Sequence, residues 1–203
     1  MRYWDYLTTI YRLSEAGIGA RLSDVAEELD VKAPTAYRVL SRLVKEGYVS
    51  KRGLTYTLTQ KGLEVAQQIV RRHRIIERFL AEILSVDPLE SHILAHELEH
   101  AENFSERVDE YLGRPSCCPH GNPVPGRAKP ASEVPLAMVK SGSYRISRIA
   151  ELGEALSYAS RTGLEVGAEI QVVGTCGDFL VIEYESQRLL IPIEVARLVY
   201  VTR

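Results

Sequence analysis

Four of the chain's five histidines lie on two stretches with helical patterning, and carboxylates accompany them at helical spacing. His73 and Glu77 are four residues apart, and the second stretch holds His92, His96, Glu99 and His100. At about 100° per residue, this second set covers one arc of roughly 100° on a helix. Imidazoles and carboxylates on one face suit a divalent metal such as Mn, Fe, Co or Zn. The alternative is a solvated polar face that happens to be rich in histidine, and the spacing favours the metal site.

The composition is that of an ordinary globular protein. The chain has 203 residues, of which 45% are hydrophobic and 26% charged, which is enough for one to three small domains with cores of their own. Residues 1–10 do not read as a signal peptide, and no segment approaches the ~18 apolar residues of a membrane span. Three cysteines, two of them adjacent, argue against a disulfide framework. We therefore expect a cytoplasmic protein with no membrane partner.

The charge is distributed unevenly along the chain. Residues 21–61 hold eight Lys and Arg against five Asp and Glu, whereas residues 62–115 hold six against eleven. A basic module joined to an acidic, histidine-bearing module suggests a polyanion partner at one end and cations in the middle.

The basic stretch has the pattern of a helix-turn-helix. Apolar spacing predicts helices over 3–16 and 24–29, the second capped by Ser23, and then a third helix that has Pro34 in its first turn and ends at Gly47. Such a third helix enters the DNA major groove, where Arg38 would read a guanine edge. The residues expected to contact DNA from this helix and the turn before it are Lys32, Ala33, Pro34, Thr35, Tyr37, Arg38, Ser41 and Arg42.

Residues 48–58 follow as two short β runs joined by a basic turn that contains glycine. A hairpin directly after a recognition helix is a wing, and Lys51 and Arg52 at its tip would meet the phosphate backbone. The alternative is a helical module used for protein contacts alone. The hairpin favours a winged helix-turn-helix DNA-binding domain over residues 1–60.

The remainder divides into helices, a linker and strands. Residues 61–114 predict three helices, the second capped by Asp87, whose apolar faces exceed the core they can form, so we expect a homodimer. Residues 115–135 are rich in Pro and Gly and predict a linker. Residues 136–203 predict a small β-barrel, and the fold class is mainly α with a β C-terminal domain. The expected strands are 136–139, 144–149, 169–173, 179–184, 187–191 and 198–201.

Four stretches of the chain resemble the diphtheria toxin repressor family of metal-activated bacterial regulators, which includes iron-dependent and manganese-transport repressors. They are Asp5–Tyr11, Arg72–Arg78, His92–His100 and Pro119–Pro125. The resemblance spans nearly the whole chain and implies a winged helix, a helical metal-binding and dimerisation domain and an SH3-like barrel. It also implies a repressor that binds an inverted-repeat operator as a dimer when Mn(II) or Fe(II) is bound, and so controls metal homeostasis genes.

The resemblance divides the candidate ligands between two sites. The ancillary site matches His73, Glu77 and His92, with Glu154 as the best match for a ligand from the barrel. The activating site matches Asp5, His96, Glu99 and His100. Asp5 follows the manganese branch, whereas His96 departs from both branches, which place Cys or Glu there. Carboxylate and imidazole ligands favour Mn(II) or Fe(II), and His96 leaves Zn(II) or Co(II) open.

Other classes of protein fit parts of this pattern. His96–His100 matches H-E-x-x-H, in which two histidines bind zinc and Glu97 acts as general base of a metallopeptidase. On a helical wheel Glu97 lies away from the arc that holds Glu99, which weighs against a peptidase. A metal-storage or delivery protein would not need the winged helix.

Cys117 and Cys118 precede His120 closely enough for thiol and imidazole groups to bind a metal. The alternative is a reduced surface pair with no ligand role, and this is the interpretation we favour.

Overall fold

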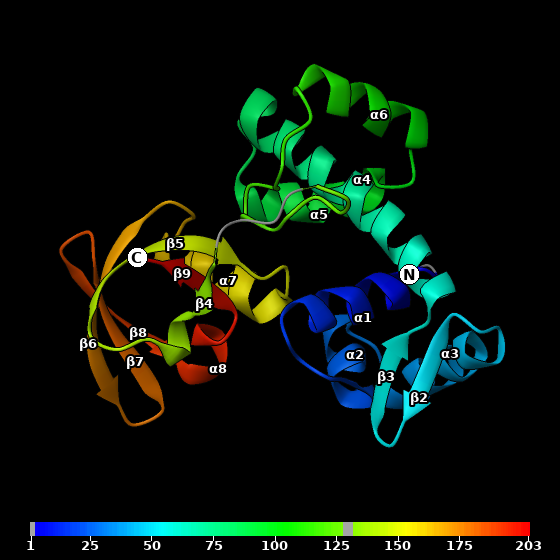
Figure 1. The fold of residues 1–203 in the computed structure, drawn as a ribbon, viewed down its shortest axis with the longest axis horizontal. Helices are drawn as coiled ribbons and strands as arrows, with labels where there is room; N and C mark the ends of the chain where they lie inside the picture. Colours follow the sequence, from blue (N-terminus) through cyan, green and yellow to red (C-terminus); the bar gives the residue numbers. More distant parts are fainter. Residues whose placement is uncertain (1–2, 128–131) are drawn as a thin grey trace. The chain divides into compact units, whose positions relative to one another are not determined.

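The computed structural model describes residues 3–127 and 132–203 (Figure 1). It divides into two compact units, Met1–Arg72 and His73–Arg203, which are taken one at a time below. The division falls inside one helix, α4 (Gln60–Leu84). Among the described residues, no helix is both long and apolar enough to cross a membrane.

The first unit confirms the predicted winged helix-turn-helix. Its elements before α4 are α1 (Asp5–Glu15), β1 (Ala20–Arg21), α2 (Leu22–Glu28), α3 (Ala33–Lys45), β2 (Val49–Arg52) and β3 (Thr55–Leu58). Strand β3 pairs antiparallel with both β1 and β2, and the wing closes through a two-residue turn at Gly53 and Leu54. Gly53 has a φ of +59°, which the first position of a type II′ turn requires. The buried side chains of its core include Leu7, Ile10, Val25, Ala36, Leu40 and Leu43.

The start of α2 differs from the prediction. Arg21, not Ser23, is its N-cap, and the Asp24 carboxylate accepts a hydrogen bond from the Arg21 N–H at 2.9 Å. The Asp24 side chain therefore satisfies the backbone N–H of the N-cap residue, and the prediction of Ser23 as the cap is wrong.

The second unit begins with three packed helices: the rest of α4, α5 (Pro88–Leu98) and α6 (Glu102–Tyr111). Helix α5 starts as predicted, because the Asp87 side chain accepts hydrogen bonds from the N–H groups of Leu89 and Glu90. Apolar side chains of α4 pack on both neighbours and fix the helices that carry the histidines. One core cluster joins Ile76, Leu80 and Ala95, and another joins Ile75, Val108 and Val124.

The Pro- and Gly-rich segment after α6 is packed as far as residue 127. Cys118, His120, Asn122 and Val124 are all buried, and Arg127 forms an ion pair with Asp109 of α6. The prediction of a linker over 115–135 is therefore wrong for this first part. Its residues 128–131 lie outside the described residues. A high content of proline and glycine does not distinguish a flexible linker from a loop that packs on a helix.

The last part of the second unit is a curled antiparallel sheet with two α-helices and a 3-10 helix (Figure 1). Its elements are β4 (Val134–Pro135), the 3-10 helix η1 (Leu136–Met138), β5 (Gly142–Ile149), α7 (Gly153–Thr162), β6 (Glu169–Cys176), β7 (Phe179–Tyr184), β8 (Gln187–Pro192), α8 (Ile193–Ala196) and β9 (Val199–Thr202). The strand order is β4-β9-β5-β6-β7-β8. The strand predicted over 136–139 is wrong, since the structure has η1 there, and α7 was not predicted. Helix α7 packs on α5 and so connects this sheet to the helices.

Candidate metal centre and DNA-binding face

The histidine centre consists of His73, His92 and His96, whose ligand atoms all lie within 4.8 Å of one another. Helix α4 presents the first, and α5 presents the other two from adjacent turns of one face. His73 Nε2 is 3.0 Å from His92 Nδ1. Glu99 closes the other side, since its Oε2 is 2.8 Å from His73 Nδ1 and 3.5 Å from His96 Nδ1. The helical spacing thus predicted a real convergence of side chains.

His100 lies beyond the last residue of α5, Leu98. Its Nε2 is 3.6 Å from Glu99 Oε1, so it still faces the same carboxylate. Glu97 is exposed, whereas Glu99 is buried. A zinc peptidase of the H-E-x-x-H type needs both histidines on one helix and the Glu97 carboxylate beside the metal. This geometry does not support the peptidase hypothesis.

A second group, the thiol centre, consists of Glu77, Cys118 and His120, whose ligand atoms also lie within 4.8 Å of one another. All three are buried, and His120 is the most exposed at 5%. His120 Nδ1 is 3.5 Å from Glu77 Oε1 and 3.9 Å from Cys118 Sγ. The Cys118 thiol donates a hydrogen bond of 3.1 Å to Oε1 of the buried Glu151. The interpretation of Cys118 as part of a surface pair is therefore wrong.

Glu77 joins the two centres. Its Oε1 is 2.6 Å from His92 Nδ1 and 3.2 Å from His73 Nε2, in addition to its contact with His120. Its Oε2 is buried and has no hydrogen-bond partner among the described residues. A buried carboxylate oxygen without a partner is costly, and a cation would satisfy it. Carboxylate, imidazole and thiolate donors together suit a divalent transition metal, so the residues present fit the metal ion that the resemblance implies.

The loop that carries Cys118 and His120 is held close to strand β5. Gly121 has a φ of +78°, and a Cβ at this position would lie 2.2 Å from the carbonyl oxygen of Ser147. Two hydrogen bonds fix the approach: Ile149 N–H donates to the His120 carbonyl at 2.9 Å, and Asn122 Nδ2 donates to the Ile149 carbonyl at 2.7 Å. Glycine is required here, since the left-handed conformation and the close approach both exclude a side chain.

The pKa values of the carboxylates in the two centres shift downward, whereas the pKa of the thiol shifts upward. Burial raises the pKa of Glu77, but the charge of His73 and hydrogen bonds from His120 and His73 bring this pKa well below its ordinary value. Glu99 behaves alike: burial raises its pKa, but hydrogen bonds from His73 and His96 bring this pKa well below its ordinary value. Burial, followed by the charge of Glu77, raises the pKa of Cys118 well above that of a free thiol. Without a cation, the site therefore holds ionised carboxylates and a protonated thiol.

Comparison with known proteins decides the family. Residues 2–54 match the model of the iron dependent repressor N-terminal DNA binding domain, residues 59–126 that of the iron dependent repressor metal binding and dimerisation domain, and residues 134–203 the FeoA domain. The chain is 30% identical to the diphtheria toxin repressor of Corynebacterium efficiens over 190 residues, which cover 85% of this chain and 83% of that relative. The chain belongs to the iron-dependent repressor family. The resemblance drawn from the sequence is thereby confirmed.

Further known proteins are similar to this chain in sequence or in fold. The iron-dependent repressor IdeR of Mycobacterium tuberculosis is 36% identical over 124 residues, so the match spans 60% of this chain and about half, 54%, of that relative. The solved structure of the manganese regulator SloR has a TM-score of 0.85 at 30% identity and covers 100% of this chain and 98% of that one. That of ScaR with bound Zn2+ has a TM-score of 0.84 at 28% identity, with both chains covered completely.

The structure places most of the ligands expected of this repressor family in one continuous cluster. His73 contacts both Glu77 and Glu99, so the residues assigned to the ancillary and activating sites adjoin each other. Asp5 lies on α1 of the first unit, where it is half-buried. Glu154, in the first turn of α7, is exposed. The barrel residue at the cluster is instead Glu151.

Cys118, His120 and Glu151 were not predicted as metal ligands from the sequence, for two different reasons. The thiol and imidazole of Cys118 and His120 were noticed, because two such groups within three residues are a metal-ligand signal. Their Pro- and Gly-rich surroundings then hid the burial that makes them ligands. Glu151 gave no local signal that distinguishes it from Glu154. Its partner in α4 lies 77 residues earlier in the chain.

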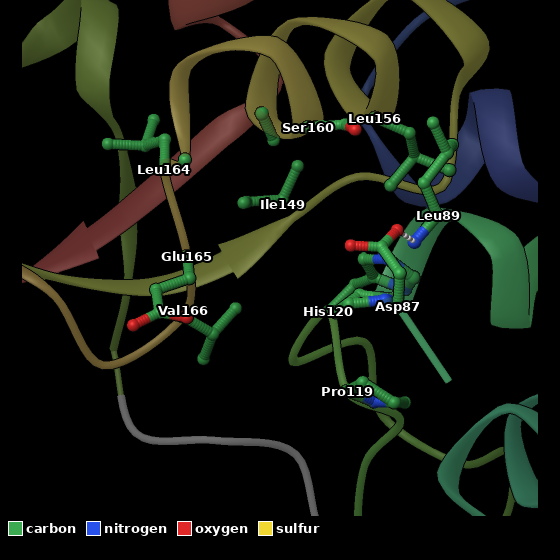
Figure 2. Close-up of a pocket in the computed structure, with 13 residues that line it drawn as sticks. Asp87, Leu89, Pro119, His120, Ile149, Leu156, Ser160, Leu164, Glu165 and Val166 are labelled. Atoms are coloured by element: carbon green, nitrogen blue, oxygen red, sulfur yellow. Dashed lines mark hydrogen bonds between the residues drawn. The ribbon is translucent and has the colours of Figure 1, made fainter. Parts of the chain in front are cut away.

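A cavity of about 130 Å³ adjoins the thiol centre on its His120 side (Figure 2). Most of its wall is apolar, and its titratable side chains are Asp87, His120 and Glu165. The Asp87 carboxylate is occupied in capping α5, as the dashed line to the Leu89 N–H in Figure 2 shows. His120 therefore lines this cavity and also contacts Glu77 and Cys118 of the thiol centre.

In the first unit, the residues predicted to contact DNA gather on the outer face of α3 and at the tip of the wing. Those that are exposed are Lys32, Ala33, Pro34, Tyr37, Arg38, Ser41, Arg42, Lys51 and Arg52, and Thr35 is half-buried. Lys51 Nζ lies 6.0 Å from the centre of the Tyr37 ring and 5.3 Å from that of Tyr56. The wing and the recognition helix therefore touch through a cation–π contact. Arg42 forms an ion pair with Glu46 at 2.8 Å.

Proposed function

We propose that this protein is a metal-activated transcriptional repressor that binds operator DNA as a homodimer and controls metal homeostasis genes. The observation that carries the proposal is one chain that holds both a winged helix-turn-helix and a buried cluster of metal-ligand side chains. A DNA-binding module alone would not need Glu77, whose buried Oε2 calls for a cation.

Two sets of residues would hold the metal. The thiol centre would do so with Glu151 beside it, and the histidine centre with Glu99 and His100. Asp5 belongs to the activating set on the strength of the family resemblance. A bound divalent ion would compensate the buried negative charge of Glu77 and tie α4, α5 and the loop of Cys118 to one another.

The metal that we propose is Mn(II) or Fe(II), since imidazole and carboxylate donors dominate the histidine centre. Names of family members mention iron for IdeR, manganese for SloR and Zn2+ for ScaR. The Cys118 thiol adds a softer donor, which is compatible with Zn(II) or Co(II) as well.

DNA binding would use the exposed face of α3 and the wing. Arg38 has the reach and the fork geometry to read a guanine, while Lys51 and Arg52 would contact phosphates. Metal-dependent coupling in such proteins is typically ~1–3 kcal/mol, or roughly 5–150-fold in DNA affinity.

A dimer explains the apolar side chains that the helices of the second unit leave exposed. They include Ile83, Leu84, Ile93 and Phe104, with Ile93 at 57% exposed. Large exposed apolar side chains on neighbouring helices are typical of an interface. Two copies would present two recognition helices to the halves of an inverted repeat. A DNA target and reduced cysteines both suit the cytoplasm.

Selection from a random duplex library tests this function without knowledge of the operator. The full chain is incubated with the library in chelator, with Mn(II), and with Fe(II) under anaerobic conditions, at one salt concentration. We expect enrichment of an inverted repeat in a metal-containing arm and none in chelator. Enrichment of the same sequence with equal efficiency in chelator would contradict metal activation. No enrichment in any arm would contradict the repressor assignment.

A further inference from the structure

Arg74 of α4 is a fully buried guanidinium that lies one turn before Glu77. Its Nε donates to both carboxylate oxygens of Glu151, at 2.9 Å to Oε1 and 3.2 Å to Oε2, and its Nη2 donates to Oε2 at 3.0 Å. Its Nη1 donates to the carbonyl of Pro123. The planar fork of arginine fixes both the position and the orientation of the carboxylate that it holds.

Glu151 and Pro123 both belong to segments that build the thiol centre. Pro123 lies in the loop that carries Cys118 and His120, and Glu151 accepts the hydrogen bond of the Cys118 thiol. Arg74 thus holds the loop and the barrel carboxylate from the same helix that presents Glu77.

The charges of the thiol centre and Arg74 balance when a divalent ion is bound. Glu77, Glu151 and a metal-bound Cys118 thiolate together carry one negative charge more than a divalent ion supplies. Arg74, buried with them, contributes the one positive charge that makes the group neutral. Burying an uncompensated charge is costly, so a neutral set is the arrangement that a dry site favours.

We propose that Arg74 is a positioning residue for the thiol centre, which holds Glu151 and the loop of Cys118 in place for a divalent ion and balances the negative charge of the ligands. This inference rests on the proposed metal-binding function. The competing view is that Arg74 forms a purely structural ion pair that attaches the barrel to α4. The two views differ in the metal affinity they expect of a folded protein in which Arg74 has been replaced.

Co(II) is a suitable probe, because a cysteine thiolate bound to Co(II) gives a near-ultraviolet charge-transfer absorption that no other ligand here produces. The full-length Arg74→Gln variant is titrated with Co(II) and its far-ultraviolet circular dichroism is compared with that of the wild type. The matched control is Arg107→Gln on α6, where the arginine side chain is exposed. We expect Arg74→Gln to bind Co(II) about 10- to 100-fold more weakly, with a reduced thiolate band, and Arg107→Gln to resemble the wild type.

Arg74→Lys keeps the charge but loses the fork, and it serves if Arg74→Gln does not fold. We expect it to fold and to bind Co(II) more weakly than the wild type. A folded Arg74→Gln or Arg74→Lys variant with the affinity and thiolate band of the wild type would overturn the proposal while leaving the metal function intact. A wild-type protein that binds no Co(II) through a thiolate would overturn the assignment of the thiol centre itself.

A double variant checks that Arg74 acts through Glu151. If it does, Arg74→Gln should weaken Co(II) binding much less in a Glu151→Gln background than in the wild type. Equal losses in both backgrounds would contradict action through this carboxylate.

Discussion

Substitution of Gly121 by alanine tests whether the close approach of the loop to β5 builds the thiol centre. The added Cβ would lie 2.2 Å from the carbonyl oxygen of Ser147 and 3.0 Å from the Cα of Arg148. Both are backbone atoms, so the loop has to move away from the strand. The left-handed conformation of an alanine costs about 1 kcal/mol. Loss of the two hydrogen bonds that join His120 and Asn122 to β5 costs about 1 kcal/mol each.

These contributions give about 3 kcal/mol, or roughly 6–12 °C in Tm for a chain of this size. Gly113→Ala is the matched control, since its φ is +69° and a Cβ there meets nothing within 4 Å. It should lose about 1 kcal/mol from the left-handed conformation alone. Thermal unfolding of the metal-free variants, followed by circular dichroism, measures the loss of stability in Gly121→Ala and in Gly113→Ala. A Co(II) titration reports whether His120 has been displaced. Equal losses of stability in the two variants would refute the reasoning about the loop.

Three further predictions concern DNA, protons and metal. Arg38→Ala should cost ~1–3 kcal/mol in operator affinity and relax the preference at one base pair, whereas Lys51→Ala should weaken binding to all sequences and reduce the salt slope by about 1; salt-dependent anisotropy distinguishes them, and the reverse pattern would contradict the assigned contacts. Burial raises the pKa of Cys118, so a metal must displace the thiol proton, and metal affinity should rise about tenfold per pH unit on account of this proton. Cys118→Ser should release one proton fewer on metal binding in a pH-indicator titration. An unchanged number of released protons would contradict a thiolate ligand. Mn(II) at 100 times its Kd should stabilise the wild type by about 2.7 kcal/mol, and calorimetry should find most of this gain absent in Glu77→Gln; a full gain in that variant would exclude Glu77 as a ligand.

Local patterns in the sequence were sufficient for helices α1 to α6, the wing and the convergence of the histidines. Apolar spacing marked α4, Asp87 and Pro88 marked the start of α5, and Gly53 marked the wing turn. His92 and His96 converge because four residues make about one helical turn, which is a property of the helix itself.

Long-range packing decided what the sequence did not reveal. The short apolar run over 136–139 reads equally as a strand, and the structure forms η1 there. Helix α7 was missed although Ala155, Leu156 and Ala159 have helical spacing and are buried.

The same holds for the thiol centre, because the residues that build it are far apart in the chain. Glu151 acquires its role from contacts with Cys118 and Arg74, which lie 33 and 77 residues away. The first turn of α7 carries Glu154 to an exposed position, whereas Glu151, two residues after the end of β5, is buried. A pattern within a few residues cannot distinguish these two carboxylates.

The central claim is that the buried cluster controls DNA binding, and anisotropy of a labelled operator duplex tests it most directly. The duplex is the inverted repeat selected from the library, and the wild type, Glu99→Gln and Glu97→Gln are titrated in chelator and in Mn(II) at one salt concentration. Glu99, the residue that caps the end of α5, is buried against His73, whereas Glu97 in the last turn of α5 is exposed. Our account predicts that Mn(II) tightens binding roughly 5–150-fold for the wild type and Glu97→Gln and has little effect on Glu99→Gln. A full Mn(II) response in Glu99→Gln, or its loss in Glu97→Gln, would contradict it.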